Sequence, residues 1–400
     1  LAKPEELRKR LGYLPQDFGV YPRVSAYDML DHMAVLKGIA GRAERRDTVE
    51  TLLAQVNLWD VRKKAIAGFS GGMRQRFGIA QALIGNPELI IVDDLRAASF
   101  LNVVEACQRR AGRPYPGRFE ATATTDLPWR KLIKRWRPAA VFHLAAITDT
   151  TVMDERVMIG DNVGSGGDPR FANPAASFRA MLLAAAERDI PVVYASSAAT
   201  YGTPPEARDR RPFAVSSAGA PNNVYGFSKW LMENEHRSVT REFTGLDPDV
   251  PDGWERSRVR RDADIDAPHI VGLRYFNVFG PGEARKGKMA SLAWQLGQQM
   301  LDGKHPRLFE HGEQARDQVS VRDVVGCTIA AAMPGARPGV YNLGSGKATT
   351  FNDVAEAVRD GLGFSPDQRP IEYFPMPEHI RAFYQDFTQA DMRGTADGLN

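Results

Sequence analysis

The chain is poor in several features that would assign it to a specialised class. Its 400 residues include two cysteines, Cys107 and Cys327, which argue against a disulfide framework or a zinc site and fit a reducing compartment. No apolar run approaches the ~18 residues that a membrane helix needs, and no secretory signal is visible. The net charge of +3 does not argue for nucleic acid. With 43% hydrophobic and 25% charged residues, the sequence predicts a soluble, cytoplasmic chain of two or three domains.

Two glycine-rich phosphate-binding sequences are also missing. The chain contains no G-x-x-x-x-G-K-[ST] loop, which cradles the phosphates in ATPases. No strand followed by G-x-G-x-x-G stands before residue 93, where a dinucleotide-binding domain would carry it. Phe69 to Gly72 with Gly78 imitates such a turn, but the run before it, Arg62 to Ala67, is a weak strand. An ATP site or a dinucleotide site in this sequence would therefore lack the glycine-rich loop whose backbone N–H groups usually bind the phosphates.

The most informative stretch runs from residue 190 to residue 229. The apolar run Ile190 to Ala195 predicts a buried parallel strand, and the hydroxylated residues Ser196 to Gly202 follow it. Pro221 to Lys229 is typical of the start of a helix. Tyr225 and Lys229 are four residues apart, so they share one face of that helix.

This arrangement suits proton transfer coupled to hydride transfer. The phenol of Tyr225 has a free pKa of about 10 and is a poor base at neutral pH, whereas an ammonium group one turn away favours the phenolate. Ser197 at the strand end can hold a substrate hydroxyl while a nicotinamide exchanges the hydride. The alternative is a chance Tyr-x-x-x-Lys spacing on an amphipathic helix. Ser197 and the approach Asn222 to Val224 favour the catalytic interpretation.

Six segments resemble the extended short-chain dehydrogenase/reductases of the NAD-dependent epimerase/dehydratase family, and within it the ADP-glyceromanno-heptose 6-epimerases. The segments are residues 194–202, 223–229, 274–281, 286–291, 308–310 and 387–391. The first two are common to many extended reductases, and the other four are more particular to the heptose epimerases. The resemblance covers about residues 89–400. It implies a Rossmann-like, doubly wound parallel α/β sheet, here without its first strand and glycine-rich loop, with a smaller C-terminal α/β substrate domain.

The resemblance also assigns roles to residues. As catalytic residues it implies Ser197, Tyr225, Lys229 and Lys286. As cofactor contacts it implies Asp93, Asp94, Ala145, Ala146, Asn162, Lys229 and Val278. As substrate contacts it implies Asn277, Lys288, Gln295, Phe309, Glu310, Arg316 and Tyr384. Lys288 and Gln295 depart from the family, which tends to a small hydroxylated residue and a histidine there. The cofactor would be NADP, with NAD as the alternative, the substrate an ADP-heptose, and the assembly a homo-oligomer.

Residues 1–92 resemble a different family, the ATP-binding subunits of ABC transporters. Gln16 matches the Q-loop, Ser70 to Gln75 the signature motif, and Leu89 to Asp93 the Walker B strand. The general-base glutamate expected after Asp93 is replaced by Asp94. We therefore expect a mostly helical ABC-like fragment over 1–88, a dinucleotide-binding domain over 89–275, and a substrate-binding part over 276–400.

The two resemblances meet near residues 92–95, which suit both families. We expect a piece of a longer reading frame at Leu1 and a shortened C-terminus at Asn400. Three functions stay open: a nucleotide-sugar epimerase, an ATP-binding transport subunit with a membrane partner, and a chimera that is inactive because both cradles are missing. No metal site and no nucleic-acid partner are expected.

Local patterns predict further elements. They are a strand at 11–14, helices at 25–59, 129–136 and 177–188, strands at 89–93, 139–146 and 270–275, an inserted loop at 166–176 and a charged surface insertion at 241–268. His143 is expected to pack in its strand rather than act as a base.

Overall fold

The computed structural model describes most of the chain. The described residues are 24–36, 39–55, 58–69, 73, 77, 80, 84, 90–96, 100–111, 117–164, 175–245, 267–333, 335–376, 378 and 384–399. They divide into two compact units, residues 1–124 and residues 125–400. The domain limits at residues 88 and 275 stay predictions. No helix of the described part is long and apolar enough to cross a membrane.

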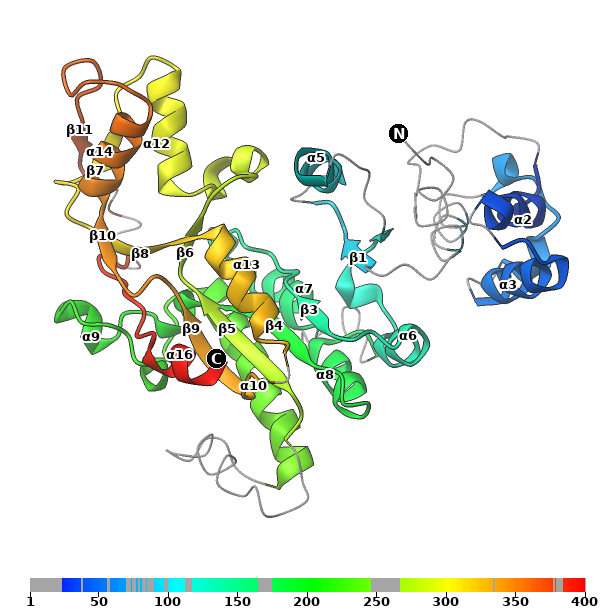
Figure 1. The fold of residues 1–400 in the computed structure, drawn as a ribbon. Coiled ribbons are helices and arrows are strands. Elements are labelled where there is room, and N and C mark those ends of the chain that lie inside the picture. The colour runs from blue at the N-terminus through cyan, green and yellow to red at the C-terminus, as the bar shows by residue number, and fades with distance from the viewer. Residues whose placement is uncertain are drawn as a thin grey trace. The chain divides into compact units, whose positions relative to one another are not determined.

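A four-stranded parallel sheet forms the centre of residues 125–400 (Figure 1). Its strands, in spatial order, are β3 (Val141–His143), β4 (Val192–Ser197), β5 (Ile270–Tyr275) and β9 (Gly339–Leu343). Val192 pairs with Ile270, and the register continues to Ser197 with Tyr275. Because all four strands are parallel, their carboxyl ends lie at one edge, where ligands bind in doubly wound folds.

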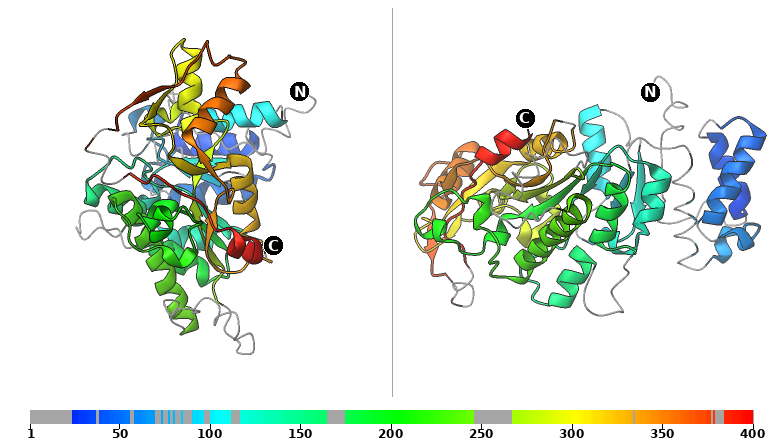
Figure 2. Two further views of the ribbon diagram at one scale, coloured as in Figure 1. Left: turned by 90° about the vertical axis from the view of Figure 1, so that its left-hand side faces the viewer. Right: turned by 90° about the horizontal axis from the view of Figure 1, so that it is seen from below.

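Helices cover both faces of this sheet (Figure 2). On one face, Phe178 of α8 (Phe178–Ala186) and His236 of α10 (Val224–Thr244) pack against the ring of Tyr194, with centroids 5.1 and 5.6 Å away. On the other face, α13 (Val321–Ala330) and α16 (Arg393–Leu399) contribute Val324 and Leu399 to a buried cluster with the sheet. The predicted doubly wound α/β architecture is confirmed.

The ends of α10 fix its length. The Asn223 side chain caps its start by accepting from the Gly226 N–H at 2.7 Å. Gly245, with φ +65°, ends it in the left-handed conformation that favours glycine. The charged insertion was predicted to begin at Arg241. That start is too early, because Arg241 still lies within the last turn of α10.

Residues 277–320 and 348–376 form a smaller region. One sheet there joins β10 (Ala348–Thr350), β8 (Ala315–Ser320) and β6 (Asn277–Phe279), and another joins β11 (Glu372–Phe374) to β7 (Arg307–Phe309). α12 (Leu292–Leu301) packs on α14 (Phe351–Gly361), with Leu296, Met300 and Phe351 in their shared core. The resemblance implies a smaller α/β region of this kind, and its role in substrate binding stays a prediction.

The remaining helices of residues 125–400 include α7 (Glu155–Val163), which packs on α10, and the short α9 (Pro205–Arg208). α6 (Trp129–Trp136) has the bounds predicted, and α8 is shorter than the predicted 177–188 because Ser177 is its cap. Short 3-10 turns are η3 (Thr124–Asp126), η4 (Ala198–Tyr201), η5 (Val215–Ser217), η6 (Glu283–Arg285) and η7 (Gly287–Met289).

The predicted strand at 139–146 is wrong in length. β3 covers three residues, and Phe142 is 41% exposed. β3 lies at one end of the described sheet, so one of its sides is not covered by a neighbouring strand. His143 is buried, as predicted, between the rings of Trp129 and Phe178.

Residues 1–124 form a unit of their own. Their described helices are α2 (Ala26–Leu36), α3 (Arg42–Gln55) and α5 (Phe100–Ala111), with turns η1 (Trp59–Val61) and η2 (Ile66–Gly68). Two helices thus replace the single stretch predicted over 25–59. β1 (Ile90–Asp93) pairs in parallel with β2 (Arg118–Ala121). The predicted strand at 11–14, Gln16, Ser70 to Gly72, Gln75 and residues 166–174 lie outside the described residues.

Candidate functional site

The carboxyl end of β4 and the first turns of α10 bring three predicted catalytic residues together. Ser197 is the last residue of β4, and its hydroxyl forms a hydrogen bond with the phenol of Tyr225. The Lys229 ammonium lies 5.9 Å from the centre of the Tyr225 ring. Gly226 permits this approach, since a Cβ atom there would stand 2.4 Å from the Ala199 carbonyl oxygen.

Lys229 carries a buried amine. Its side chain is 2% exposed, and its Nζ donates to the Ala195 carbonyl oxygen at 2.8 Å and lies 3.7 Å from the Met232 sulfur. Burial lowers the pKa of Lys229 to about 7. An ammonium group has three donors, so Lys229 retains donor capacity for a further acceptor.

The pKa of Tyr225 is raised above its ordinary value. Burial of the phenol is the main cause, and the hydrogen bond with Ser197 opposes it. The net shift is upward because burial disfavours the phenolate more than the hydrogen bond with Ser197 favours it. The expectation that Lys229 favours the phenolate stays a prediction.

The predicted cofactor contact Asn162 joins the loop after β3 to α10. Its Oδ1 accepts from the Ile147 N–H at 2.7 Å, and its Nδ2 donates to the Ser228 hydroxyl at 2.9 Å. Ala145 and Ala146 lie half-buried in that loop. Asn162 thus fixes the path of the loop next to the residue that precedes Lys229.

Of the predicted site residues after β5, Val278 packs against the core, whereas Asn277, Lys286 and Lys288 are exposed. Val278 packs against the apolar cluster of the sheet, whereas Asn277 is exposed at the start of β6. Lys286 is exposed between η6 and η7. Lys288 forms an ion pair with Asp149 at 3.1 Å, which connects this loop to the segment after β3.

Three predicted substrate contacts meet near β8. The guanidinium of Arg316 lies 5.1 Å from the centre of the Tyr384 ring, and the Tyr384 ring lies 5.9 Å from that of Phe309. Arg316 is 9% exposed, and no hydrogen bond reaches its Nη1 within the described part of the protein. Burial lowers the pKa of Arg316. Glu310 accepts from the Met376 N–H at 3.1 Å.

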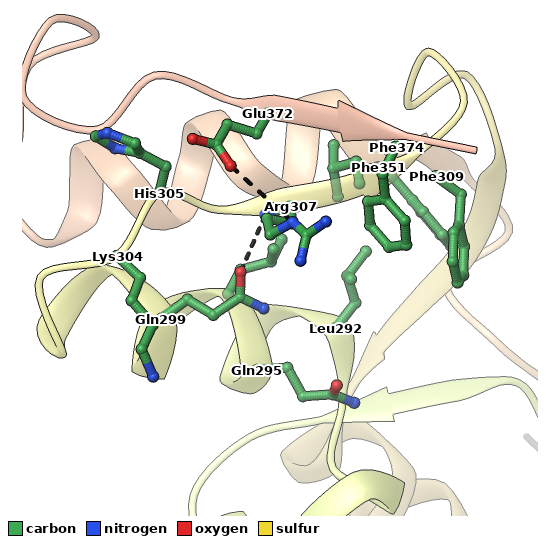
Figure 3. A pocket seen from close by; sticks show the side chains of 12 residues that line it. Leu292, Gln295, Gln299, Lys304, His305, Arg307, Phe309, Phe351, Glu372 and Phe374 are labelled. Atoms are coloured by element: carbon green, nitrogen blue, oxygen red, sulfur yellow. Dashed lines mark hydrogen bonds and ion pairs between the residues drawn. The ribbon is translucent and has the colours of Figure 1, made fainter. Parts of the chain in front are cut away.

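A cavity of about 660 Å³ lies in the smaller region (Figure 3). Its apolar wall includes Phe309 and Phe374, and Gln295 stands at its α12 side. Gln295 also donates to the Ala290 carbonyl oxygen at 2.7 Å. On the polar side, Arg307 lies 4.5 Å from the Phe374 ring centre. An aromatic wall with a polar rim suits a flat, polar-edged ligand.

Asp93 and Asp94 belong to the other unit. The Asp93 carboxylate accepts from the Leu95 N–H at 2.6 Å, and Asp94 pairs with Arg96 at 2.5 Å. Both contacts are local, so the two residues form a turn after β1. Their role as cofactor contacts stays a prediction.

The sequence interpretation missed a buried polar group beneath the site. Glu233 and Arg274 are 0% and 1% exposed and form an ion pair at 2.7 Å. Glu233 follows Lys229 by four residues, as Lys229 follows Tyr225. That repeated spacing could have indicated that Glu233 shares the face of Tyr225 and Lys229. Nothing in the sequence indicated that Arg274 is its partner.

The residues present fit one half of a nicotinamide dinucleotide. The buried Lys229, which has donor capacity left, and the Tyr225 phenol lie at the strand ends where the nicotinamide and its ribose would bind. The pyrophosphate half has no glycine-rich turn in this sequence. The fit therefore covers the reacting end of such a cofactor.

Comparisons with known proteins agree with this geometry. Residues 79–344 match the NAD dependent epimerase/dehydratase family, and residues 2–97 match the ABC transporter family. ADP-L-glycero-D-manno-heptose-6-epimerase from Helicobacter pylori is 25% identical, with a TM-score of 0.55 over 78% of this chain and 89% of that chain. UDP-N-acetylglucosamine 4-epimerase from Methanobrevibacter ruminantium is 23% identical, with a TM-score of 0.60 over 78% and 84%.

UDP-glucose 4-epimerase from Thermotoga maritima is 20% identical, with a TM-score of 0.54 over 78% of this chain and 84% of that chain. The last two likenesses are evidence for the fold. The family match covers more than half of the chain and includes β4 and the start of α10. The chain belongs to the NAD dependent epimerase/dehydratase family.

Proposed function

We propose that the protein is an isomerase, a nucleotide-sugar epimerase that interconverts ADP-D-glycero- and ADP-L-glycero-manno-heptose. The meeting of Ser197, Tyr225 and Lys229 at the end of β4 carries the proposal. A bound NADP, or NAD, would take a hydride from the sugar carbinol and return it to the opposite face. The sequence particular to heptose epimerases around Lys286 and Phe309 supports the choice of sugar.

Tyr225 and Ser197 hold the reacting hydroxyl in this proposal. The Ser197 hydroxyl is hydrogen-bonded to the phenol, so a substrate hydroxyl placed between them would exchange its proton with Tyr225. Lys229 lies one turn further along α10 and can donate to a ribose hydroxyl while it stays on the Ala195 carbonyl oxygen. A cation there favours the phenolate once substrate and cofactor exclude water.

Lys286 would act as the second acid/base or positioning group. Its exposed position on the loop after β6 leaves the amine accessible to a bound sugar. An epimerase needs access to both faces of the reacting carbon, and a second group on a different element provides it.

Arg316 would bind the diphosphate of the nucleotide sugar. A buried guanidinium with no hydrogen bond to its Nη1 in the described part is costly unless an anion completes it. Two oxygens of a diphosphate can accept hydrogen bonds from one guanidinium in a bidentate geometry. Tyr384 and Phe309 would flank the nucleotide from the adjoining wall.

Binding and turnover test the proposal separately. Titration with the reduced cofactor NADPH, followed by nicotinamide fluorescence, should show binding that Lys229→Met weakens. ADP-glycero-manno-heptose and UDP-glucose should then be compared as substrates. The proposal expects at least about tenfold higher kcat/KM for the heptose, the effect of one well-placed contact. A preference for UDP-glucose would contradict the heptose assignment and leave the epimerase chemistry standing.

A further inference from the structure

The catalytic face of α10 extends one turn beyond Lys229. Tyr225, Lys229 and Glu233 are spaced by four residues, so their side chains lie in one row along the helix. Glu233 is 0% exposed, although it carries a carboxylate. A fully buried carboxylate is retained where it is paired and hydrogen-bonded, so its contacts show what it holds.

The side chains of this row form hydrogen bonds with three successive residues of β4. Tyr225 is hydrogen-bonded to Ser197, and Lys229 donates to the Ala195 carbonyl oxygen. The residue between them, Ser196, donates from its hydroxyl to Oε1 of Glu233 at 2.6 Å. The strand and the helix are thus joined at three consecutive points, of which two belong to the proposed catalytic residues.

Arg274 of β5 binds the Glu233 carboxylate that also accepts from Ser196. Its Nε donates to Oε1 of Glu233 at 2.9 Å and its Nη2 to Oε2 at 2.7 Å, a bidentate pair. The remaining Nη1 donates to the Val215 carbonyl oxygen at 2.7 Å and to the Tyr201 hydroxyl at 3.1 Å. Arg274 is 1% exposed. The pair therefore anchors α10 to two neighbouring strands and to the loop that contains Val215.

Stability alone does not account for such a pair. Replacing a buried ion pair by apolar residues of similar volume is often neutral or stabilising, because removing two charges from water is costly. A bidentate pair does, however, fix the distance and angle between the groups that carry it. A slip of α10 along β4 would break these bonds and would also move Lys229 and Tyr225.

We propose that Glu233, held by Arg274 and Ser196, is a positioning residue for the reaction. It fixes the register of α10 on β4 so that Lys229 and Tyr225 meet the substrate and cofactor at the strand end. The kinetic part of this proposal rests on the proposed function, whereas the placement of Lys229 can be tested without turnover.

The main test replaces the whole pair, in the double variant Glu233→Met with Arg274→Met. This change removes both charges of the pair together. Arg237, which also contacts Glu233 at 3.4 Å, keeps its hydrogen bond to Asn234 at 2.7 Å, so the fold should be retained and circular dichroism checks it. The rate of acetylation of Lys229 is then compared with that of the exposed Lys304 by mass spectrometry. We expect the ratio to rise by about tenfold, because Lys229 is no longer held on the Ala195 carbonyl oxygen.

A milder variant and a control make the comparison specific. Ser196→Ala removes one hydrogen bond to Glu233, leaves the ion pair, and should raise the ratio by a smaller factor. Glu235→Gln changes a carboxylate on the same helix that pairs with Arg179 at 3.0 Å, and it should leave the ratio unchanged. If the double variant does not fold, Ser196→Ala decides the question.

Kinetics provide the second measurement. In the double variant kcat should fall by about tenfold to a hundredfold with KM little changed, because misplacing a reacting group by 1 Å can cost about a hundredfold. Lys229 acetylation that stays at the wild-type ratio in a folded variant would overturn the positioning role. Absence of turnover in the wild-type protein, with the acetylation ratio changed as expected, would instead contradict the proposed function alone.

Discussion

The two units hold their polar groups in different ways. In residues 125–400, Arg274 binds Glu233 across 41 positions of sequence, and Tyr201 donates to Asn342 across 141. In residues 1–124, Arg45 binds Asp31 across 14 positions, and Asp93 accepts from Leu95 two residues away. Local contacts shape a turn, whereas contacts between distant elements fix side chains relative to one another. The second arrangement is the one that a catalytic site requires.

The comparison extends to the motifs that each unit carries. Residues 2–97 match a family of ATPases, but the phosphate loop with its lysine is missing from the sequence. In residues 125–400, all three residues of the proposed proton-transfer site are present and adjacent. The assembled side chains of residues 125–400 are therefore the stronger indication of function.

The largest expected effect concerns the phenol. Tyr225→Phe should lower the turnover of ADP-heptose by about 10²–10⁴-fold, the usual contribution of a general acid or base. Tyr373→Phe is the matched control, since that phenol is 50% exposed and donates to Asn352. Epimer formation followed by NMR measures both. Equal losses in the two variants would remove Tyr225 from its proposed role.

The next effect concerns the buried ion pair. Arg274→Leu removes the bidentate partner of the buried Glu233 and leaves Arg237, at 3.4 Å, as its paired cation, so we expect a loss of about 3–5 kcal/mol in the free energy of unfolding of residues 125–400. Urea unfolding followed by hydrogen exchange measures it. The exchange of residues 24–69 should not change. A loss shared equally by both units would contradict their separate cores.

A substitution in the other unit gives the reverse comparison. Leu53 is fully buried in the cluster of α2 and α3, and Leu53→Ala should cost that unit about 2–5 kcal/mol. Hydrogen exchange within residues 26–55 should accelerate, while α10 keeps its protection. Accelerated exchange in α10 would show that the first unit stabilises the second.

The last expected effect is a pH dependence. Burial lowers the pKa of His143 to about 4 and of His236 to about 3, whereas both titrate near 6.5 when unfolded. The unfolded state therefore binds more protons below pH 6.5, and stability is lost as the pH falls from 6.5 towards 4. The slope is about 1.4 kcal/mol per pH unit for each histidine. His143→Phe should halve it, and an unchanged slope would exclude His143.

The sequence predicted the elements whose signal is local. The apolar run of β4, the helix that starts at Asn223, and the pairing of Tyr225 with Lys229 follow from periodicity and capping. β3 was predicted too long, because the length of a strand depends on the neighbour with which it pairs, and β3 pairs with β4 only from Val141 to His143.

Long-range pairs could not be predicted in the same way. Glu233 showed the right spacing on its helix, but its partner Arg274 lies in an apolar strand where a charge has no local explanation. The raised pKa of Tyr225 likewise depends on burial, which a motif does not show. The Glu233–Arg274 pair and the pKa of Tyr225 both depend on tertiary packing.

Interconversion of the two ADP-heptose epimers tests the central claim most directly. The purified chain would be incubated with NADP and one pure epimer of ADP-glycero-manno-heptose, and C6 would be followed by NMR. The proposed function predicts that either epimer yields a mixture of both and that Tyr225→Phe prevents it. A single epimer that stays unchanged while cofactor and nucleotide sugar are both bound would contradict it.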